Sequence, residues 1–471
     1  MKQPSTKNPK AKSAPKKATV KTPNPETAGQ PPVEPSIPTG IDTLGAAKIP
    51  SPLFKDGKED GELLFVKDTD RILMNIDAGE VLETMRAGKI PASFEKAGPR
   101  ADIFFNPAML RCAIVTCGGL CPGLNDIIRS IVLELHYRYH VPTVYGVKFG
   151  LAGFIPEYRY PLVSLTPDRV RAIHEMGGTI LGSSRGAQDF SKIVDCLEIQ
   201  NIGLLFIIGG EGTIMAATKI CNEIEKRGVN IGVVAIPKTI DNDIYLVERS
   251  FGFDTAVEMA TAAIRSAHTE AEGFPNGIGL VKLMGRNAGF IAATAVLAQQ
   301  DVNFALIPES DFDLAGEHGL LAALEARLAH RGHGVIVVAE GAGQRFFPDT
   351  PENRDASGNK KLQDIGGYLK SEIIAHFAKK KIEINLKYID PSYMIRSLPA
   401  NSNDTVFCSA LARNAVHAGM AGKTRLLAGF WKGEFVHVPL DATAGKHKKI
   451  NPNGGLWQAV LEATGQGPLK N

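Results

Sequence analysis

The feature that most restricts the fold of this chain is a regular alternation of strand and helix patterns that begins near residue 111. Short apolar runs rich in β-branched residues are typical of buried strands, and longer runs with helical periodicity lie between them. The predicted strands cover residues 111–117, 204–208, 231–236, 277–284, 304–308, 334–340 and 385–389, and the predicted helices cover residues 126–139, 213–227, 255–272, 288–297, 319–330, 365–380 and 404–421. This alternation predicts an α/β fold with parallel sheets covered by helices.

Length, charge and cysteine usage narrow the class of protein. The 471 residues suffice for two or three domains of about 150 residues each. A net charge of +3 gives no reason to expect a nucleic-acid or membrane partner, and no apolar stretch approaches the ~18 residues of a membrane-spanning helix. The six cysteines are scattered, which fits a reducing compartment better than a disulfide framework. We therefore expect a cytoplasmic protein.

Residues 1–40 differ in composition from the rest of the chain. They contain nine prolines and seven lysines, with almost no aromatic or large apolar side chains. Such a segment buries too little apolar surface to offset its ordering entropy, so we expect a disordered basic tail. A targeting peptide is the weaker interpretation, because the segment lacks arginine. Residues 41–110 form an N-terminal extension before the first strand of the alternating region.

The most informative polar segment is Pro-Lys-Thr-Ile-Asp-Asn-Asp at residues 237–243, directly after the apolar run 231–236. Open α/β sheets bind ligands at the carboxyl ends of their strands, where this heptad is expected to lie. One of its two carboxylates can take a proton from an attacking hydroxyl, and the other can help to hold a metal. The alternative is a polar turn that leads into the helix near Thr255.

Three glycine-rich loops also follow predicted strands or lie between elements. They are Gly-Gly-Leu-Cys-Pro-Gly-Leu-Asn at 118–125, a small-residue loop with one arginine at 177–186, and Gly-Gly-Glu-Gly-Thr at 209–213. Glycine lets backbone N–H groups approach an anion, and a following helix N-terminus favours negative charge. Tight packing between strands and helices also requires glycine. None of the loops has the Walker pattern, so a P-loop kinase is disfavoured.

A last group of residues, four of them charged, falls at or just after predicted strand ends. It consists of Met284, Gly285, Arg286, Glu340, Lys387, Tyr393 and Arg396. Each cation alone is more often structural or solvated. Together they suit a sugar-phosphate pocket, with Arg and Lys for the phosphate and Glu for hydroxyls.

These motifs, in this order, resemble the ATP-dependent 6-phosphofructokinases over roughly residues 95–465. The long-chain branch of plants and trypanosomatids is the most similar, because of Ala-Gly-Pro-Arg at 97–100 and Lys-Tyr-Ile-Asp-Pro-Ser-Tyr at 387–393. The resemblance implies two parallel-sheet α/β domains with the active site in the cleft between them. A nucleotide-binding domain would comprise residues 111–253 and about 395–445, and a sugar-phosphate domain residues 254–394 and about 446–471. It also implies a homo-oligomer, a tetramer or a dimer.

The resemblance implies a role for each motif. Asp241 would be the base that accepts the proton of the sugar's 1-hydroxyl, with Thr239 supporting the reacting phosphoryl group and Arg286 neutralising its charge. ATP would be held by Gly118, Arg185, Gly186, Gly210, Glu211, Gly212 and Thr213, and Mg²⁺ by Glu211 and Asp243. Fructose 6-phosphate would be held by Thr239, Ile240, Asp241, Met284, Gly285, Arg286, Glu340, Lys387, Tyr393 and Arg396.

The sequence also departs from the family pattern. Glu211 stands where aspartate is usual, and Gly277 stands where short bacterial members have an arginine. Lys387 and Tyr393 stand where those members have arginine and histidine, so bacterial allosteric residues are not carried over.

Two residues bear on the phosphoryl donor. Lys238 resembles members that use pyrophosphate, whereas Gly212 resembles members that use ATP. We expect ATP, because an aspartate at position 212 would repel the α-phosphate, whereas an extra lysine excludes nothing. The alternatives are a pyrophosphate-dependent enzyme, a catalytically silent regulatory subunit, and a lipid or NAD kinase.

Overall fold

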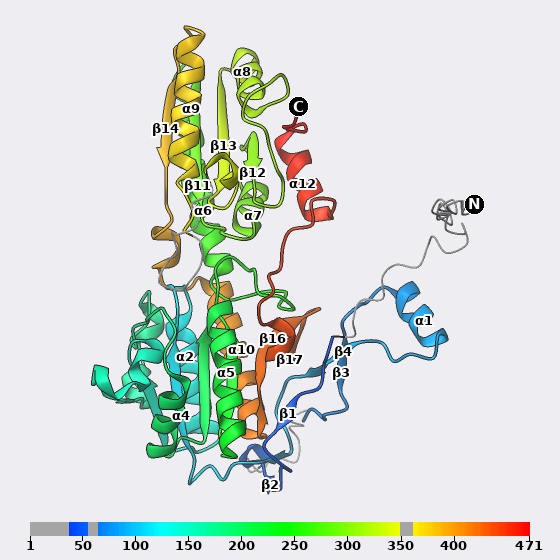
Figure 1. Ribbon diagram of the computed structural model, residues 1–471, viewed down its shortest axis with the longest axis vertical. Coiled ribbons are helices and arrows are strands. Elements are labelled where there is room, and N and C mark those ends of the chain that lie inside the picture. Colours follow the sequence, from blue (N-terminus) through cyan, green and yellow to red (C-terminus); the bar gives the residue numbers. More distant parts are fainter. Residues whose placement is uncertain (1–36, 55–64, 349–360) are drawn as a thin grey trace, which may run out of the picture. The chain divides into compact units, whose positions relative to one another are not determined.

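The computed structural model describes residues 37–54, 65–348 and 361–471 (Figure 1). The chain separates into two units, Met1–Ile37 and Pro38–Asn471, and the second unit holds every element discussed below. Most of the expected disordered tail therefore lies outside the described residues. Within the described ranges, no helix combines the length and the apolar character needed to cross a membrane.

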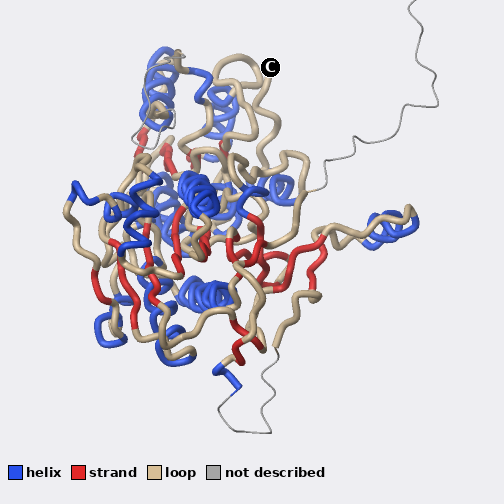
Figure 2. The backbone as a smooth tube through the Cα atoms, turned by 60° about the horizontal axis from the view of Figure 1, so that its bottom comes forward, coloured by secondary structure: helices blue, strands red, loops and turns tan. Residues whose placement is uncertain are grey.

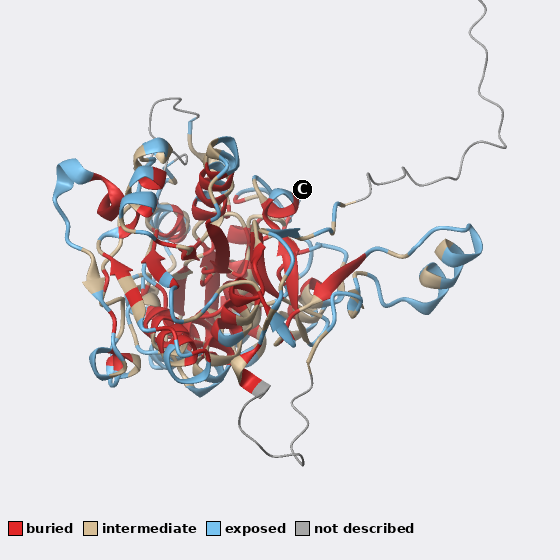
Figure 3. Cartoon of the chain, turned by 90° about the horizontal axis from the view of Figure 1, so that it is seen from below, coloured by how far each residue is buried: buried red, intermediate tan, exposed pale blue. Residues whose placement is uncertain are grey.

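The first of two large sheets has nine strands in the order β3-β4-β17-β16-β10-β9-β6-β7-β8. They are β3 (Arg71–Leu73), β4 (Ser93–Lys96), β6 (Arg111–Thr116), β7 (Thr143–Val147), β8 (Val163–Ser164), β9 (Leu204–Gly209), β10 (Gly232–Pro237), β16 (Leu426–Trp431) and β17 (Glu434–Pro439). Neighbours from β16 to β7 pair in parallel. Both β9 and β10 are buried throughout, which explains their continuous apolar runs (Figure 3).

The connections in this sheet create a crevice at its carboxyl edge. Helix α2 (Leu124–Leu133) links β6 to β7, toward one edge of the sheet, and α5 (Glu211–Arg227) links β9 to β10, toward the other. Right-handed crossovers therefore place α2 and α5 on opposite faces. The strand order reverses between β6 and β9, and ligands of open α/β sheets bind in the crevice at such a point.

The second large sheet has four parallel strands in the order β12-β13-β11-β14. They are β12 (Phe304–Leu306), β13 (His333–Ala339), β11 (Gly277–Leu283) and β14 (Asn385–Ile389). One group of helices packs together around α7: α6 (Phe253–Glu272), α7 (Phe290–Ala298) and α12 (Gly455–Thr464). Helices α8 (Leu320–Arg331) and α9 (Ile365–Lys379) also pack against this sheet (Figures 1 and 2).

Two apolar cores hold these layers together. The larger core runs from the first sheet through α6 and α7 to the second sheet, and it includes Phe206, Ile264 and Val337. The smaller core lies between the second sheet and α8 and α9, and it includes Leu324 and Ile373. Because α6 contributes to the larger core, this helix joins the two sheets beside the crevice.

The chain returns to the first sheet after completing the second. Helix α10 (Ser402–Met420) packs on α2 and β10, and the hairpin β16–β17 extends the sheet. The turn residues Lys432 and Gly433 have φ values of 51° and 83°, as a two-residue turn with both central residues at positive φ requires. The Lys-Gly turn therefore joins β16 and β17 as a hairpin.

The N-terminal extension completes the first sheet through a buried charge cluster. Glu95 of β4 is buried and accepts from Arg100 at 2.8 Å, and Lys423 lies 3.2 Å from the same carboxylate. Arg100 also bonds Asp68 at 2.9 Å. The arginine of the Ala-Gly-Pro-Arg motif therefore fixes the extension to the sheet.

The predicted α/β fold is confirmed, with small shifts of element ends. Every predicted strand and helix is present among the described residues. The predicted helix 126–139 consists of α2 followed by a π-helical turn, η3 (Glu134–Arg138). The predicted strand 304–308 is the shorter β12.

Candidate active site

A cleft of about 480 Å³ lies where the crevice of the first sheet meets the segment after β11. The residues predicted from the sequence that line it are Gly118, Arg185, Gly186, Gly210, Glu211, Gly212, Thr213, Lys238, Thr239, Asp241, Asp243 and Arg286. These residues come from five separate stretches of the chain. The fold thus brings the glycine-rich loops and the heptad together at one point.

The first two glycine-rich loops lie against each other. Gly118 has φ +84°, a conformation that side-chain-bearing residues rarely adopt. Its N–H donates to the Ser184 carbonyl at 3.2 Å, and its own carbonyl accepts from the Ser183 hydroxyl at 2.6 Å. Arg185 follows directly, and these contacts hold its backbone at the cleft.

The third glycine-rich loop begins α5 and opens toward the cleft. Gly210 caps the helix without a side-chain hydrogen bond. The first backbone N–H groups of a helix are natural anion ligands. A Cβ built at Gly212 meets no heavy atom of the described residues within 4 Å. A larger side chain at position 212 would therefore have room to project there.

The heptad folds into a tight loop after β10. The Asp241 N–H donates to the Thr239 hydroxyl at 3.0 Å, and that hydroxyl donates to Asp243 at 3.2 Å. Asn242 between the two aspartates has φ 53°, which asparagine tolerates. Its amide oxygen accepts from the Ser250 N–H at 3.0 Å. Local hydrogen bonds thus hold the Asp241 backbone and the Asp243 carboxylate.

Asp241 has the electrostatics of a proton acceptor. Its Oδ1 atom is buried, and within the described residues no donor reaches it. Burial, with the nearby carboxylates of Asp243 and Glu340, raises the pKa of Asp241 to about 8. A hydrogen bond from the Arg286 backbone opposes this rise. A carboxyl with an open acceptor atom and a pKa near neutrality suits general-base catalysis.

Lys238 binds the protein backbone in this structure. The side chain is buried, and its ammonium donates to the Gly119 carbonyl at 2.8 Å. Burial lowers the pKa of Lys238. This contact ties the heptad to the first glycine-rich loop.

His447 is a cleft residue that the sequence analysis did not identify. Its Nε2 lies 2.8 Å from Glu211 Oε2, and its Nδ1 lies 3.6 Å from Asp243 Oδ2. The interaction with Asp243, together with the charge of Glu211, raises the pKa of His447. The next residue, Lys448, donates its N–H to the Asp243 carbonyl at 2.8 Å. No motif surrounds His447, so only the fold reveals its place.

Two of the predicted sugar-phosphate ligands lie beside the cleft. A Cβ built at Gly119 would lie 3.3 Å from a guanidinium nitrogen of Arg396 and 3.5 Å from one of Arg185. Burial raises the pKa of Glu340, and the charges of Arg286 and Arg396 oppose this rise. Arg396 and Glu340 are therefore electrostatic neighbours of the residues that line the cleft.

The remaining predicted sugar-phosphate ligands are not among the residues that line the cleft. The Lys387 ammonium lies 5.2 Å from the centroid of the Phe274 ring, and Phe274 precedes β11 at its amino end, away from Arg286. Tyr393 is 75% exposed, and its ring lies 4.9 Å from the Arg396 guanidinium. Ile240 is buried and Met284 packs against the larger core, while Gly285 lies in the turn between β11 and α7.

Glycine-rich loops, paired carboxylates and an arginine in one cleft define a site for phosphate chemistry. A sequence profile of the phosphofructokinase family matches residues 111–419. The chain belongs to the phosphofructokinase family.

Proteins similar in sequence to this chain come from several lineages. The chain is 49% identical over 436 residues to the "ATP-dependent 6-phosphofructokinase" of Borreliella burgdorferi, covering 90% of this chain and 96% of that protein. It is 48% identical to "ATP-dependent 6-phosphofructokinase 7" of Arabidopsis thaliana, covering 79% and 77%. It is 43% identical to the "ATP-dependent 6-phosphofructokinase" of Trypanoplasma borreli, covering 91% of this chain and 87% of that protein. The expected similarity to plant and trypanosomatid enzymes is confirmed.

Solved structures agree on the fold. The pyrophosphate-dependent phosphofructokinase of Marinobacter aquaeolei superposes with a TM-score of 0.63 at 20% identity, covering 76% of this chain and 92% of that one. The enzyme of that name from Nitrosospira multiformis gives 0.62 at 19% identity, covering 77% and 93%. At this identity the similarity concerns the fold alone, and it does not bear on the donor.

Proposed function

We propose that this chain transfers the γ-phosphoryl group of ATP to the 1-hydroxyl of D-fructose 6-phosphate, which gives fructose 1,6-bisphosphate and ADP. The observation that carries this proposal is Asp241, a cleft residue whose buried Oδ1 atom has no hydrogen-bond partner among the described residues, together with the glycine-rich loops and Arg286 in the same cleft. The curated relatives at 43–49% identity with this enzymatic name support the same reaction.

The residues divide the chemical step between them. The 1-hydroxyl oxygen attacks the γ-phosphorus, its proton passes to Asp241 Oδ1, and the bond to the β-phosphate oxygen breaks as ADP leaves. Arg286 stabilises the negative charge on the transferred group, and Thr239 keeps the heptad loop in place. Phosphoryl transfer depends mainly on positioning and on charge stabilisation, and these residues provide both.

Glu211 and Asp243 fit a role in holding Mg²⁺. Both carboxylates line the cleft, and each lies next to one nitrogen of the His447 imidazole. Mg²⁺ prefers oxygen ligands and binds through one or two carboxylates together with substrate phosphates. When bound, the ion would supply positive charge next to the phosphates.

Two features favour ATP over pyrophosphate as the donor. Position 212 faces open space and carries no charge, so nothing there repels an α-phosphate. Lys238, the residue that resembles pyrophosphate-using members, is buried, and its ammonium already donates to the Gly119 carbonyl. We propose that Gly118, Arg185, Gly186, Gly210 and Thr213 hold the nucleotide.

The acceptor would lie on the side of the second sheet. We propose that Arg396 and Glu340 bind the sugar phosphate, with Met284, Gly285 and Ile240 shaping the backbone around it. The predicted roles of Lys387 and Tyr393 are retained as predictions. We also propose a cytoplasmic homo-oligomer, as the sequence similarity implies.

The proposal is tested by product identification. The purified chain is incubated with ATP, Mg²⁺ and fructose 6-phosphate, and the product is identified by ³¹P NMR and by cleavage with aldolase. Fructose 1,6-bisphosphate and ADP in equal amounts are expected, with glucose 6-phosphate as a control acceptor. A folded protein that forms no bisphosphate would contradict the proposal.

A further inference from the structure

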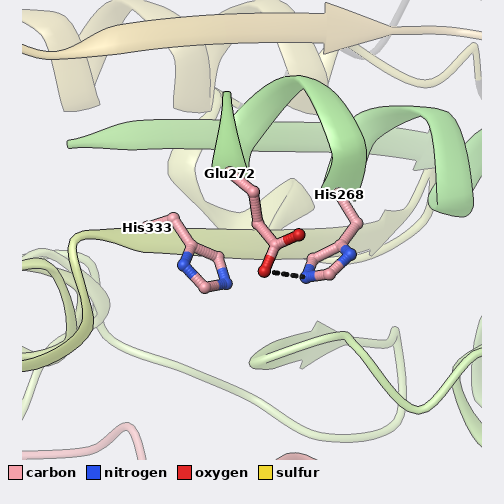
Figure 4. A group of neighbouring side chains, drawn as sticks. All are labelled: His268, Glu272 and His333. Atoms are coloured by element: carbon pink, nitrogen blue, oxygen red, sulfur yellow. Dashed lines mark ion pairs between the residues drawn. The ribbon is translucent and has the colours of Figure 1, made fainter. Parts of the chain in front are cut away.

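A second group of ionisable side chains lies at the opposite end of the second sheet from the catalytic cleft. His268 and Glu272 are one turn apart at the end of α6, and His333 is the first residue of β13 (Figure 4). Glu340, near the catalytic cleft, follows the other end of β13. The 7 residues of that strand separate the two places by roughly 20 Å.

The three side chains converge on one point. Each offers one ligand atom, and these atoms lie within 4.8 Å of one another. His268 Nε2 lies 3.7 Å from Glu272 Oε1, and the rings of His268 and His333 are 5.4 Å apart between centroids. A tetrahedral ion with bonds of about 2.0–2.1 Å would place its ligands roughly 3.3 Å apart. The ligand atoms must therefore approach one another by up to about 1.5 Å, and the Glu272 side chain, which is 57% exposed, has room to move.

A neighbouring carboxylate faces the first imidazole. Asp301 Oδ2 lies 3.7 Å from His268 Nδ1, the ring nitrogen on the other side from Glu272. Gln299 donates to Asp301, and Arg265 donates to Gln299 at 3.3 Å. A metal-binding histidine commonly turns its second nitrogen toward a carboxylate in this way.

The combination of residues favours a transition metal over a simple ion pair. An ion pair with Glu272 needs one histidine, whereas here two imidazoles face the same carboxylate. Two histidines and one glutamate form a known three-ligand zinc set that leaves a fourth position for water. Mg²⁺ prefers oxygen ligands, so this group differs in selectivity from the catalytic carboxylates.

We propose that His268, Glu272 and His333 bind one divalent transition-metal ion, with Zn²⁺ preferred over Mg²⁺. Asp301 is a positioning residue that acts through His268. The ion joins the end of α6 to the beginning of β13. The proposal does not depend on the catalytic function.

The test measures zinc binding to the full-length, tag-free protein. The chain is freed of metal with EDTA and titrated with Zn²⁺ in excess Mg²⁺, and bound zinc is measured by equilibrium dialysis and elemental analysis. The wild-type chain should bind one zinc more than the double variant His268→Asn/His333→Asn. Replacement of the exposed His318 by Asn is the matched control and should leave binding unchanged.

Two single variants keep the test decisive if the double variant folds poorly. Glu272→Gln should weaken zinc binding at least 100-fold with an unchanged melting temperature in EDTA. Asp301→Asn should weaken it roughly 10- to 100-fold without changing the stoichiometry. Zinc binding that is equal in wild type and Glu272→Gln, that is displaced by Mg²⁺, or that is lost only in His447→Asn would overturn the proposal.

Discussion

The two sides of the cleft are built in different ways. The side formed by the first sheet presents backbone: Gly118 lies in a loop held by hydrogen bonds, and Gly210 lies at the start of α5. The other side presents the long side chain of Arg286, with the charged side chains of Glu340 and Arg396 beside the cleft. Asp241 lies where the two sides meet.

This difference indicates how each half of the reaction is recognised. A surface made of backbone binds phosphates through its N–H groups, and an added side chain or negative charge there weakens phosphate binding. A side-chain surface depends on the charge of each residue. Substitutions on the two sides should therefore affect different kinetic parameters, and the following predictions test this division.

The largest effect is expected at the meeting point. Asp241→Asn keeps the shape of the side chain and removes its proton affinity, so kcat should fall roughly 10²–10⁴-fold with little change in KM for the sugar phosphate. Steady-state kinetics measure this, with the exposed Asp168→Asn as the matched control. A variant that retains more than about a tenth of wild-type kcat would rule out this role for Asp241.

The next effect concerns the backbone side. Gly212→Asp adds a carboxylate in open space next to the nucleotide phosphates and should lower kcat/KM for ATP at least ~10²-fold, or ~2.7 kcal/mol. Gly212→Ala adds only a methyl group and should stay within a few-fold of wild type. Equal losses in both variants would mean that shape, and not charge, governs this position.

A smaller effect is expected on the side-chain side. Arg396→Ala removes a charge-assisted contact worth ~1.5–3 kcal/mol, so KM for fructose 6-phosphate should rise roughly 10- to 100-fold. The KM for ATP should change far less, and Arg396→Lys should recover part of the loss. If both substrates weaken equally, Arg396 is structural and the division between the two sides fails here.

A residue that packs near the first sheet should also make the folded chain less stable in acid. The His417 side chain of α10 is mostly buried, 12% exposed, and bonds the Tyr139 hydroxyl at 2.8 Å, and desolvation lowers its pKa from 6.5 to about 3. As the pH falls below 6.5, the unfolded chain therefore binds a proton that the folded chain excludes. This lowers the free energy of unfolding by up to ~1.4 kcal/mol per pH unit.

The variant His417→Gln isolates this contribution. Burial raises the pKa of neighbouring Glu134, so protonation of Glu134 stabilises the folded chain as the pH falls, opposite to the effect of His417. Wild type and variant both keep Glu134, so its effect cancels in the comparison. Urea unfolding at a series of pH values should show a shallower loss of stability in the variant. Parallel curves for the two chains would contradict a neutral, buried His417.

The smallest effect is predicted for the tail. Residues 1–40 have a composition that supports no apolar core, so their deletion should leave kcat and the melting temperature nearly unchanged. A large drop in either quantity would show that the tail belongs to one side of the cleft or to an interface.

Much of the fold could be predicted because its central strands are buried on both faces. The runs at β9 and β10 are continuously apolar and are bounded by glycine or polar residues. By contrast, β7 alternates buried and half-buried residues and was not predicted, nor was α4 (Phe190–Ile199). The extension strands β3 and β4 are short and depend on the charge cluster around Glu95, which links residues distant in sequence.

The candidate site was predictable where it is built from local segments. The glycine-rich loops and the heptad contain their own turn residues, such as Gly118 and Asn242, so their spacing carries the information. His447 reaches the cleft only through contacts with distant residues, and no local pattern marks it. The cluster of His268, Glu272 and His333 is hidden for the same reason, because only the pairing of β11 with β13 brings its members together.

The most direct test of the central claim compares the two donors in one coupled assay. The wild-type chain is given fructose 6-phosphate and Mg²⁺ with either ATP or pyrophosphate, and kcat/KM is measured for each donor. Because the backbone side leaves position 212 open and uncharged, turnover is predicted with ATP and not with pyrophosphate. Faster turnover with pyrophosphate than with ATP would contradict the account.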